Sequence, residues 1–239
     1  MISGIFDGEK MKFAALQPTS TLDFPGKLSA ILFVGGCVFR CPYCHNPDLI
    51  DPKKNVLSEE EVLTRLESRK KFVDAVSLTG GEITLHKDLP DFIRKLKDKG
   101  FSVKIDTNGT NPEMIEKILP MLDFIAMDVK ATLTQEHYDR TTKVKTDIDS
   151  IDQSIHLIKN SGTDYEFRTT VVEKLFSVEK FKELGKVLKG SKKHVIQQFV
   201  NRRTLDPDYQ NEIPYLKDQL FKIRSIMKEY VDQVEIRGI

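Results

Sequence analysis

The residues with the clearest chemical potential are Cys37, Cys41 and Cys44, the only cysteines in the chain of 239 residues. Three thiolates with the spacing Cys-x₃-Cys-x₂-Cys can surround one compact metal centre. A [4Fe–4S] cluster normally takes four cysteines, so one iron of such a cluster would lack a protein ligand here. An open coordination position is what a catalytic metal centre needs, as zinc enzymes illustrate. The segment therefore predicts one catalytic cluster held by three cysteines.

Three other interpretations of these cysteines stay open. They could be metal-free structural residues, ligands of a zinc ion that recruits His45, or ligands of a simple electron-transfer cluster. A zinc chelate is awkward because the adjacent residues Cys44 and His45 point in different directions. A disulfide framework is disfavoured because an odd number of cysteines lies in one loop.

The elements that must position these residues follow from alternating sequence patterns. Residues 28–34 form a nearly continuous apolar run, which is typical of a strand buried on both faces. Beyond the cysteines, Ser58-Glu59-Glu60-Glu61 is a capping box that predicts the start of a helix. Further strands are predicted at 75–78, 102–106, 124–128, 165–172 and 194–200, with a short seventh at 234–236. Helical stripes are predicted at 89–96, 114–119, 148–158, 181–188 and about 214–230.

Six βα units in succession require a parallel sheet with right-handed crossovers. The chain is slightly short for eight units, so we expect one α/β domain over residues 1–239. Its expected architecture is an open, partial (β/α)₆ barrel, an incomplete TIM-like barrel with parallel strands. A doubly wound sheet is the alternative. In both folds, chemistry belongs at the carboxyl ends of the strands.

Composition excludes several classes of function. The net charge is +1, from 37 basic and 36 acidic residues, which does not suggest a nucleic-acid partner. The strongest apolar run, 28–34, is far shorter than the roughly 18 residues of a membrane span. Residues 1–10 turn acidic before any apolar stretch develops, so we expect no signal peptide. These features predict a cytoplasmic protein without a membrane partner.

Polar residues follow the second and third predicted strands. In Thr79-Gly80-Gly81-Glu82, the glycines would let the backbone approach a ligand, and Glu82 could accept from an ammonium group. A plain tight turn is the alternative. Asp106-Thr107-Asn108-Gly109 could be a hairpin turn, but the helical pattern that follows it argues against a second strand.

Charged residues end the next two strands. Asp106 and Asp128 together could hold a cation, and Lys130 could meet a carboxylate. A solvated strand end is the alternative for Asp128 and Lys130. Arg168 and Gln198 are further candidate contacts by position, although Gln198 could equally be a buried core amide.

The cysteine segment resembles the signature of the radical S-adenosylmethionine superfamily, Cys-x₃-Cys-x-aromatic-Cys, with Tyr43 as the aromatic residue. The resemblance implies that the open iron binds the amino and carboxylate groups of S-adenosylmethionine. One electron then cleaves the sulfonium and gives a 5′-deoxyadenosyl radical. Gly80, Gly81 and Glu82 resemble the superfamily motif that holds the methionine amine. The implied cofactor contacts are Tyr43, His45, Gly80, Gly81, Glu82, Asp106, Asn108, Asp128, Lys130, Arg168 and Gln198.

The motifs Asp-Thr-Asn-Gly and Asp-x-Lys resemble those of the glycyl-radical-enzyme activases. Residues 23–27, 35–37 and 41–47 are similar to the activating proteins of anaerobic ribonucleoside-triphosphate reductase, and more broadly to pyruvate formate-lyase activating enzymes. This resemblance implies hydrogen abstraction from a glycine of a partner enzyme, with anaerobic ribonucleotide reductase favoured. It also implies flavodoxin or ferredoxin as the reductant.

Alternative functions stay open because the specific motifs end near Lys130. The chain could activate another glycyl radical enzyme, of the pyruvate formate-lyase type. It could also act on a small molecule, as a deazaguanine synthase does, but that family resembles Cys-x-Trp-Cys-Asp where this chain has Cys-Pro-Tyr-Cys-His. A non-catalytic metalloprotein is the third possibility. Residues 201–208 are a candidate partner-facing or lid loop.

Overall fold

The computed structural model describes residues 10–51 and 57–239. The first nine residues, which carry most of the argument against a signal peptide, lie outside the described residues. The strands are β1 (Phe13–Ser20), β2 (Ser29–Val34), β3 (Ala75–Gly80), β4 (Ser102–Thr107), β5 (Phe124–Asp128), β6 (Asp164–Val171), β7 (Lys193–Gln198) and β8 (Gln233–Arg237). The α-helices are α1 (Glu59–Arg69), α2 (Leu89–Asp98), α3 (Pro112–Ile118), α4 (Gln135–Thr142), α5 (Ile148–Asn160), α6 (Lys180–Val187) and α7 (Lys217–Met227).

Within the described residues, the strands form one sheet in the order β1 to β8. Strands β2 to β8 are parallel neighbours, which confirms all six predicted strands and the short seventh. Strand β1 was not predicted, and it pairs antiparallel with β2. The predicted parallel sheet is therefore confirmed, and β1 adds one antiparallel strand at its edge. No pairing joins β8 to β1 in the described part of the chain, so the barrel is open.

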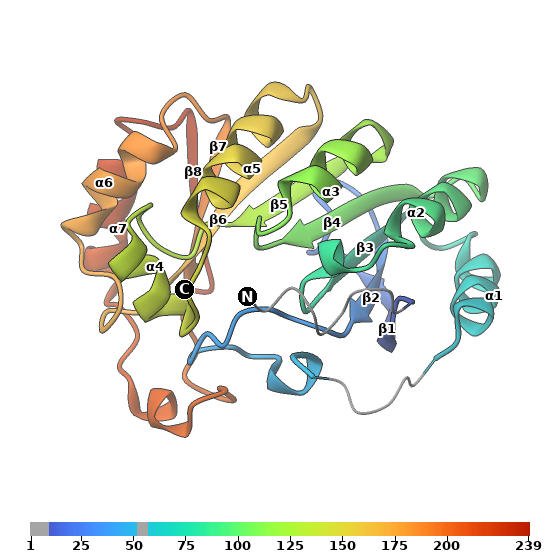
Figure 1. Cartoon of the computed structure of the whole chain (residues 1–239), viewed down its shortest axis with the longest axis horizontal. Helices are drawn as coiled ribbons and strands as arrows, with labels where there is room; N and C mark the ends of the chain where they lie inside the picture. Colours follow the sequence, from blue (N-terminus) through green and yellow to red (C-terminus); the bar gives the residue numbers. More distant parts are fainter. Residues whose placement is uncertain (1–9, 52–56) are drawn as a thin grey trace.

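The helices lie on the outer side of the curved sheet, where α1, α2, α3, α5 and α6 follow one another in an arc (Figure 1). Their apolar stripes pack on the outward side chains of the strands, as in α2, where Phe92, Ile93 and Leu96 are fully buried. Because side chains alternate along a strand, every second residue instead faces the inside of the open barrel.

The amino-terminal side of the inner face is closed by a small apolar cluster. Phe24 packs with Ala75, Phe124 and Ala126, which lie at or near the starts of β3 and β5. The Phe24 and Phe124 rings lie 6.1 Å apart. Access to the inner face is therefore left at the carboxyl ends of the strands, as expected for this class of fold.

Helix α4 was not predicted, because its sequence, QEHYDRTT, has no apolar stripe. It nevertheless buries Tyr138, whose hydroxyl accepts a hydrogen bond from the Lys130 backbone N–H at 3.2 Å. Its last residue, Thr142, accepts from the Arg40 backbone N–H at 2.8 Å. The helix therefore holds the end of β5 and the cysteine loop in place. None of the helices in the described ranges is long and apolar enough to cross a membrane.

Candidate cluster and cofactor site

The loop that carries the cysteines, residues 35–50, is closed at its base by backbone hydrogen bonds. The Gly36 N–H donates to the Leu49 carbonyl at 2.7 Å, and the Cys37 N–H donates to the Ile50 carbonyl at 3.1 Å. Within the loop, the Arg40 guanidinium donates to the Cys37 carbonyl at 2.8 Å. These contacts hold the three cysteines together on a compact loop.

The far side of this loop is attached to the segment that follows β7. The His45 Nδ1–H donates to the Arg203 carbonyl at 2.9 Å, and the His45 ring stacks on Phe199 with 5.7 Å between centroids. The Asp206 N–H donates to the Pro42 carbonyl at 2.9 Å. The cysteine loop therefore reaches from the β2 side of the open barrel to the β7 side (Figure 1).

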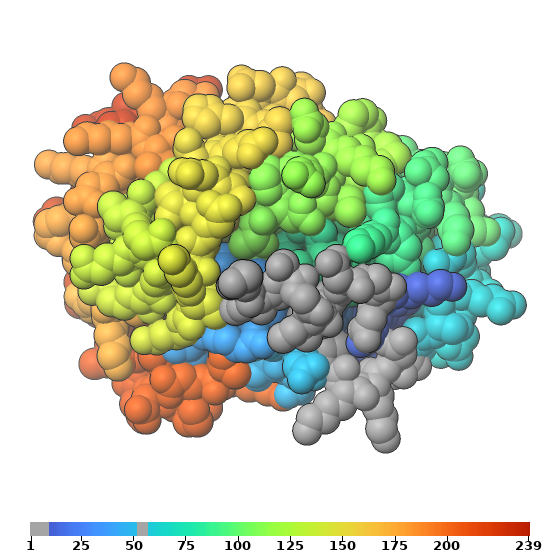
Figure 2. Space-filling view, viewed as in Figure 1, coloured from blue at the N-terminus to red at the C-terminus, as the bar shows by residue number. Residues whose placement is uncertain are grey.

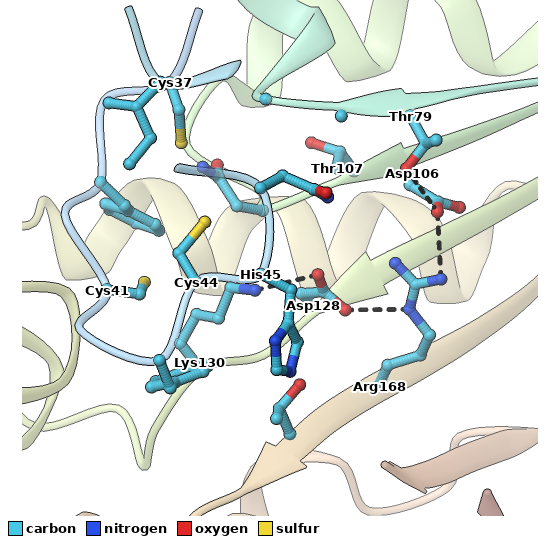
Figure 3. A pocket seen from close by; sticks show the side chains of 18 residues that line it. Cys37, Cys41, Cys44, His45, Thr79, Asp106, Thr107, Asp128, Lys130 and Arg168 are labelled. Carbon is cyan, nitrogen blue, oxygen red and sulfur yellow. Dashed lines mark hydrogen bonds and ion pairs between the residues drawn. The ribbon is translucent and has the colours of Figure 1, made fainter. Parts of the chain in front are cut away.

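A cavity of about 230 Å³ lies between the cysteine loop and the carboxyl ends of β3 to β6. Figure 3 shows the three cysteines along one side of it and the charged strand-end residues along the other. The predicted site residues that line it are Cys37, Cys41, Tyr43, Cys44, His45, Gly80, Gly81, Asp106, Asn108, Asp128, Lys130 and Arg168. Among the described residues, Glu82 and Gln198 are the predicted contacts outside this lining.

Gly80 and Gly81 are needed for close contact between two loops. A Cβ on Gly81 would lie 1.9 Å from the Gly36 carbonyl oxygen, and one on Gly80 would lie 2.5 Å from the Val34 oxygen. Gly80 also has a φ of 122°, which side chains other than hydrogen rarely tolerate. The Gly81 N–H can therefore donate to the Val34 carbonyl at 2.8 Å. The glycines join the end of β3 to the base of the cysteine loop.

Glu82 lies outside the residues that line the cavity, and its carboxylate is bound within the protein. Its Oε1 accepts from the hydroxyls of Thr84 at 2.6 Å and Thr107 at 2.7 Å. Its Oε2 accepts from the Asn108 N–H at 2.5 Å. Burial raises the pKa of Glu82, although these bonds oppose the shift. The side chain thus joins the segment after β3 to the turn after β4, and its contact with a cofactor amine stays a prediction.

Gln198 is the second predicted contact that lies outside the lining, and it is buried. Its Nε2 donates to the Tyr215 carbonyl at 2.6 Å, and 8% of the residue is exposed. Gln198 therefore matches the alternative interpretation of a buried core amide.

Several cavity residues were missed because their types carry no specific signal: Phe39, Asn46, Ile50, Thr79, Thr107 and Thr170.

Five charged side chains on adjacent strands form what we call the mouth network: Lys104, Asp106, Asp128, Lys130 and Arg168. Arg168 joins the two acids, since its Nη1 lies 3.1 Å from Asp106 and its Nε 2.9 Å from Asp128 (Figure 3). Lys130 pairs with the other Asp128 oxygen at 2.9 Å. Lys104 pairs with Asp106.

The electrostatics of the site favour the charged forms of its acids. Burial raises the pKa of Asp106, but Arg168 and Lys104 outweigh it and lower that pKa below its ordinary value. Arg168 and Lys130 act in the same way on the pKa of Asp128. Burial raises the pKa of Cys37 to about 12 and that of Cys41 to about 11. The thiols of Cys37 and Cys41 are thus protonated until a metal displaces the protons.

The donor set fits a cluster better than a single ion. In residues 10–51 and 57–239, no three His, Cys, Asp or Glu side chains converge on a point where one metal ion could sit. A cubane has a separate iron for each thiolate, so its ligands surround a volume instead of meeting at a point. Cys37, Cys41 and Cys44 do line one shared cavity.

Comparison with known proteins places this geometry in context. The model of the radical SAM superfamily matches residues 31–189. A protein of Methanocaldococcus jannaschii with the provisional name glycyl-radical enzyme activating enzyme is 35% identical, over 100% of this chain and 96% of its own length. The pyruvate formate-lyase-activating enzyme of Clostridium pasteurianum is 29% identical over 74% of this chain and 75% of its own.

Two solved structures share the fold. The peptide-bound SuiB of Streptococcus suis has a TM-score of 0.64 at 14% identity, over 83% of this chain and 46% of that longer one. QueE of Escherichia coli has a TM-score of 0.51 at 16% identity, over 96% of this chain and 92% of its own. At these identities the likeness concerns the open barrel alone.

Proposed function

The chain belongs to the radical S-adenosylmethionine superfamily and, within it, to the glycyl-radical-enzyme activating enzymes, and from this premise we propose that it generates a glycyl radical on anaerobic ribonucleoside-triphosphate reductase. The proposal rests mainly on one observation. The three cysteines line the same cavity as four members of the mouth network, Asp106, Asp128, Lys130 and Arg168. One wall suits a cluster with an open iron, and the other suits a zwitterionic cofactor.

When bound, the cluster and S-adenosylmethionine would supply the difficult chemistry, a one-electron cleavage of the sulfonium. The chain's own residues bind the cluster and orient S-adenosylmethionine. Cys37, Cys41 and Cys44 would hold the cluster through three of its irons and leave the fourth without a protein ligand. Lys130 and Arg168 orient the methionine carboxylate by charge-assisted hydrogen bonds. Phe39 and Ile50 contribute apolar surface to the cavity and help to exclude water.

A macromolecular partner is supported by the rim of the cavity. The segment after β7 borders the cysteine loop at the lower edge of the face in Figure 2. Around this segment Val200, Ile213 and Leu216 are exposed, the last two by 76% and 67%. Exposed apolar side chains near this segment suit a transient protein contact. This agrees with a partner-facing role for residues 201–208.

The preference for the reductase rests on residues 23–27, 35–37 and 41–47, whose motifs resemble those of its activating proteins. A second candidate is activation of a pyruvate formate-lyase, because the similarity to the Clostridium pasteurianum enzyme extends over 74% of this chain. Both candidates require the same cavity and differ only in the protein that presents the glycine.

The test is to mix the reduced protein, S-adenosylmethionine and anaerobic ribonucleotide reductase without oxygen. A doublet glycyl-radical signal is expected on the reductase, and it should disappear when its glycine is replaced by alanine. The matched control is the Cys41→Ala variant, which should give no signal. A doublet on pyruvate formate-lyase alone would select the second candidate. If 5′-deoxyadenosine forms only with a small metabolite present, both assignments fail.

The reductant is proposed to be flavodoxin or ferredoxin, because the sequence holds no further cysteine for a second cluster. Cluster potentials reach about −700 mV, and sulfonium cleavage needs the low end of that range. Cleavage of S-adenosylmethionine should therefore require dithionite, flavodoxin or ferredoxin. Turnover in the absence of all three would refute this part of the proposal.

A further inference from the structure

Lys104 is a buried lysine that no sequence motif singles out. It lies on β4 two residues before Asp106, so the two side chains share the inner face of the sheet. Only 3% of its side chain is exposed, and its ammonium group pairs with Asp106. A buried lysine is rare unless it is paired, and removing one partner of such a pair is costly. Its position beside a cofactor site therefore needs an explanation.

The spacing of Asp106 and Asp128 predicts a cation between them, but each of their four carboxylate oxygens already accepts a hydrogen bond from a protein donor. On Asp106, Oδ1 accepts from Lys104, and Oδ2 accepts from Arg168 and from the Thr79 hydroxyl at 3.0 Å. On Asp128, Oδ1 accepts from Arg168 and Oδ2 from Lys130. A bound cation would compete with these donors for both carboxylates.

We propose that the ammonium group of Lys104 takes the place of a bound cation at this site. Lys104 is then a positioning residue that acts through Asp106 and does not itself line the cavity within the described residues. With it, the mouth network carries one more positive than negative charge, which favours an anionic group in the cavity. Without it, that excess disappears and one Asp106 oxygen loses its partner.

The inference uses the S-adenosylmethionine site of the proposed function but not the identity of the partner. It predicts that cofactor binding by the natural chain does not depend on sodium, potassium or ammonium ions. It also predicts that Lys104→Met creates such a dependence, because a small cation can then occupy the position left beside Asp106.

The experiment measures the dissociation constant of S-adenosylmethionine by equilibrium dialysis on anaerobically reconstituted protein. Choline, potassium and ammonium chloride are compared at equal ionic strength. The natural chain should bind within about twofold in all three salts. Lys104→Met should bind about tenfold more weakly in choline, the scale of one charge-assisted contact, and recover at least severalfold in ammonium or potassium.

The matched control is Lys193→Met, which removes a lysine on the inner face of β7 that is paired with Glu166 and Glu235, away from the cavity. Its cofactor binding should remain independent of the salt. If Lys104→Met does not fold, Lys104→Arg keeps the charge and should bind as the natural chain does.

Three results would overturn the inference. They are a clear gain in affinity of the natural chain on adding potassium, unchanged binding by Lys104→Met in choline, and a loss that neither cation restores. A chain that binds S-adenosylmethionine as expected but forms no glycyl radical refutes the proposed function and leaves this inference intact.

Discussion

Two networks of alternating charge lie on the same sheet, and only one belongs to the cavity. The mouth network joins β4, β5 and β6. A second network, which we call the edge network, joins β6 to β8 and consists of Glu166, Lys193, Glu235 and Arg237. Arg237 binds both oxygens of Glu166, at 2.7 and 2.8 Å, and Glu166 is 1% exposed.

The difference between the networks lies in their charge balance. The edge network has two acids and two bases, so its charges are satisfied internally. The mouth network has two acids and three bases, and all of its members except Lys104 line the cavity that the cysteines share. Buried charge alone therefore does not mark a binding site. An unbalanced charge at the carboxyl ends of strands, facing an open cavity, does.

The largest expected effect concerns the cysteines, which lie across the cavity from the mouth network. Cys41→Ala should lose the cluster, because two thiolates cannot hold a cubane that normally takes four ligands. Iron content should fall from about four per chain toward zero, and cleavage of S-adenosylmethionine should fall to background. Thermal unfolding of both metal-free proteins is the control. A variant that keeps about four irons would contradict the assignment of this cysteine.

The second prediction compares the networks directly through two matched variants. Arg168→Met should weaken binding of S-adenosylmethionine at least about tenfold, because it removes the charge that joins both acids of the cavity. Arg237→Met should cost about 3–5 kcal/mol of unfolding free energy, because Glu166 is left buried without its main partner.

Cofactor binding by folded Arg237→Met should be unchanged. Equilibrium dialysis and denaturant titration on both variants check this pair of outcomes. The comparison between the networks breaks down if Arg237→Met impairs binding as much as Arg168→Met does.

The fold was largely predictable because its strands are buried on both faces and therefore read as apolar runs. The exceptions have clear reasons. Strand β1 is an exposed edge that contains Pro18, and α4 buries His137, Tyr138 and two threonines instead of an apolar stripe. Neither element carries the periodic signal on which sequence analysis depends.

The candidate site was predictable in its residue types and spacing but not in side-chain direction. The order of strand ends placed Asp106, Asp128 and Arg168 together correctly. It could not indicate that Glu82 lies outside the cavity lining, because a residue after a strand can face either way. Lys104 was missed because a lysine within a strand run does not reveal which buried acid it meets.

A third prediction uses the pH dependence of the unfolding free energy to distinguish both networks from another buried group, His194. His194 lies on β7, fully buried, and burial lowers its pKa to about 3. It stays neutral in the folded chain, whereas the unfolded chain binds a proton below pH 6.5. The free energy of unfolding should therefore fall as the pH falls from 6.5, by up to about 1.4 kcal/mol per unit.

The networks titrate in a different range. Arg237 lowers the pKa of Glu235 to about 2, and the pKa values of Asp106 and Asp128 are also lowered. Acids with depressed pKa values lose their stabilising contribution only as the pH falls below about 4. Denaturant titrations from pH 7 to 5 should show a slope in the natural chain that is smaller in His194→Gln, where the remaining slope comes from His137, whose pKa burial also lowers. An equal slope in this variant would assign the effect to other groups.

The smallest effect concerns a charge pair outside both networks. Arg203 and Asp48 pair across the loops at the cavity rim, with side chains 63% and 73% exposed. Exposed pairs contribute about 0–1 kcal/mol, so Asp48→Asn should change the unfolding free energy by less than about 1 kcal/mol and leave iron content unchanged. A loss of several kcal/mol would show that this contact holds the cysteine loop, as the His45–Arg203 bond does.

The attachment of the cysteine loop to the segment after β7 also affects the order of events during synthesis. His45 and the Arg203 carbonyl that it binds are separated by 158 residues. At about 5–20 residues per second, a ribosome makes that length in roughly 8 to 30 s. During this interval the cysteine loop has been synthesised, but its contacts with the segment after β7 cannot yet form. The metal centre is therefore best installed after the segment that follows β7 has been made and has joined the loop.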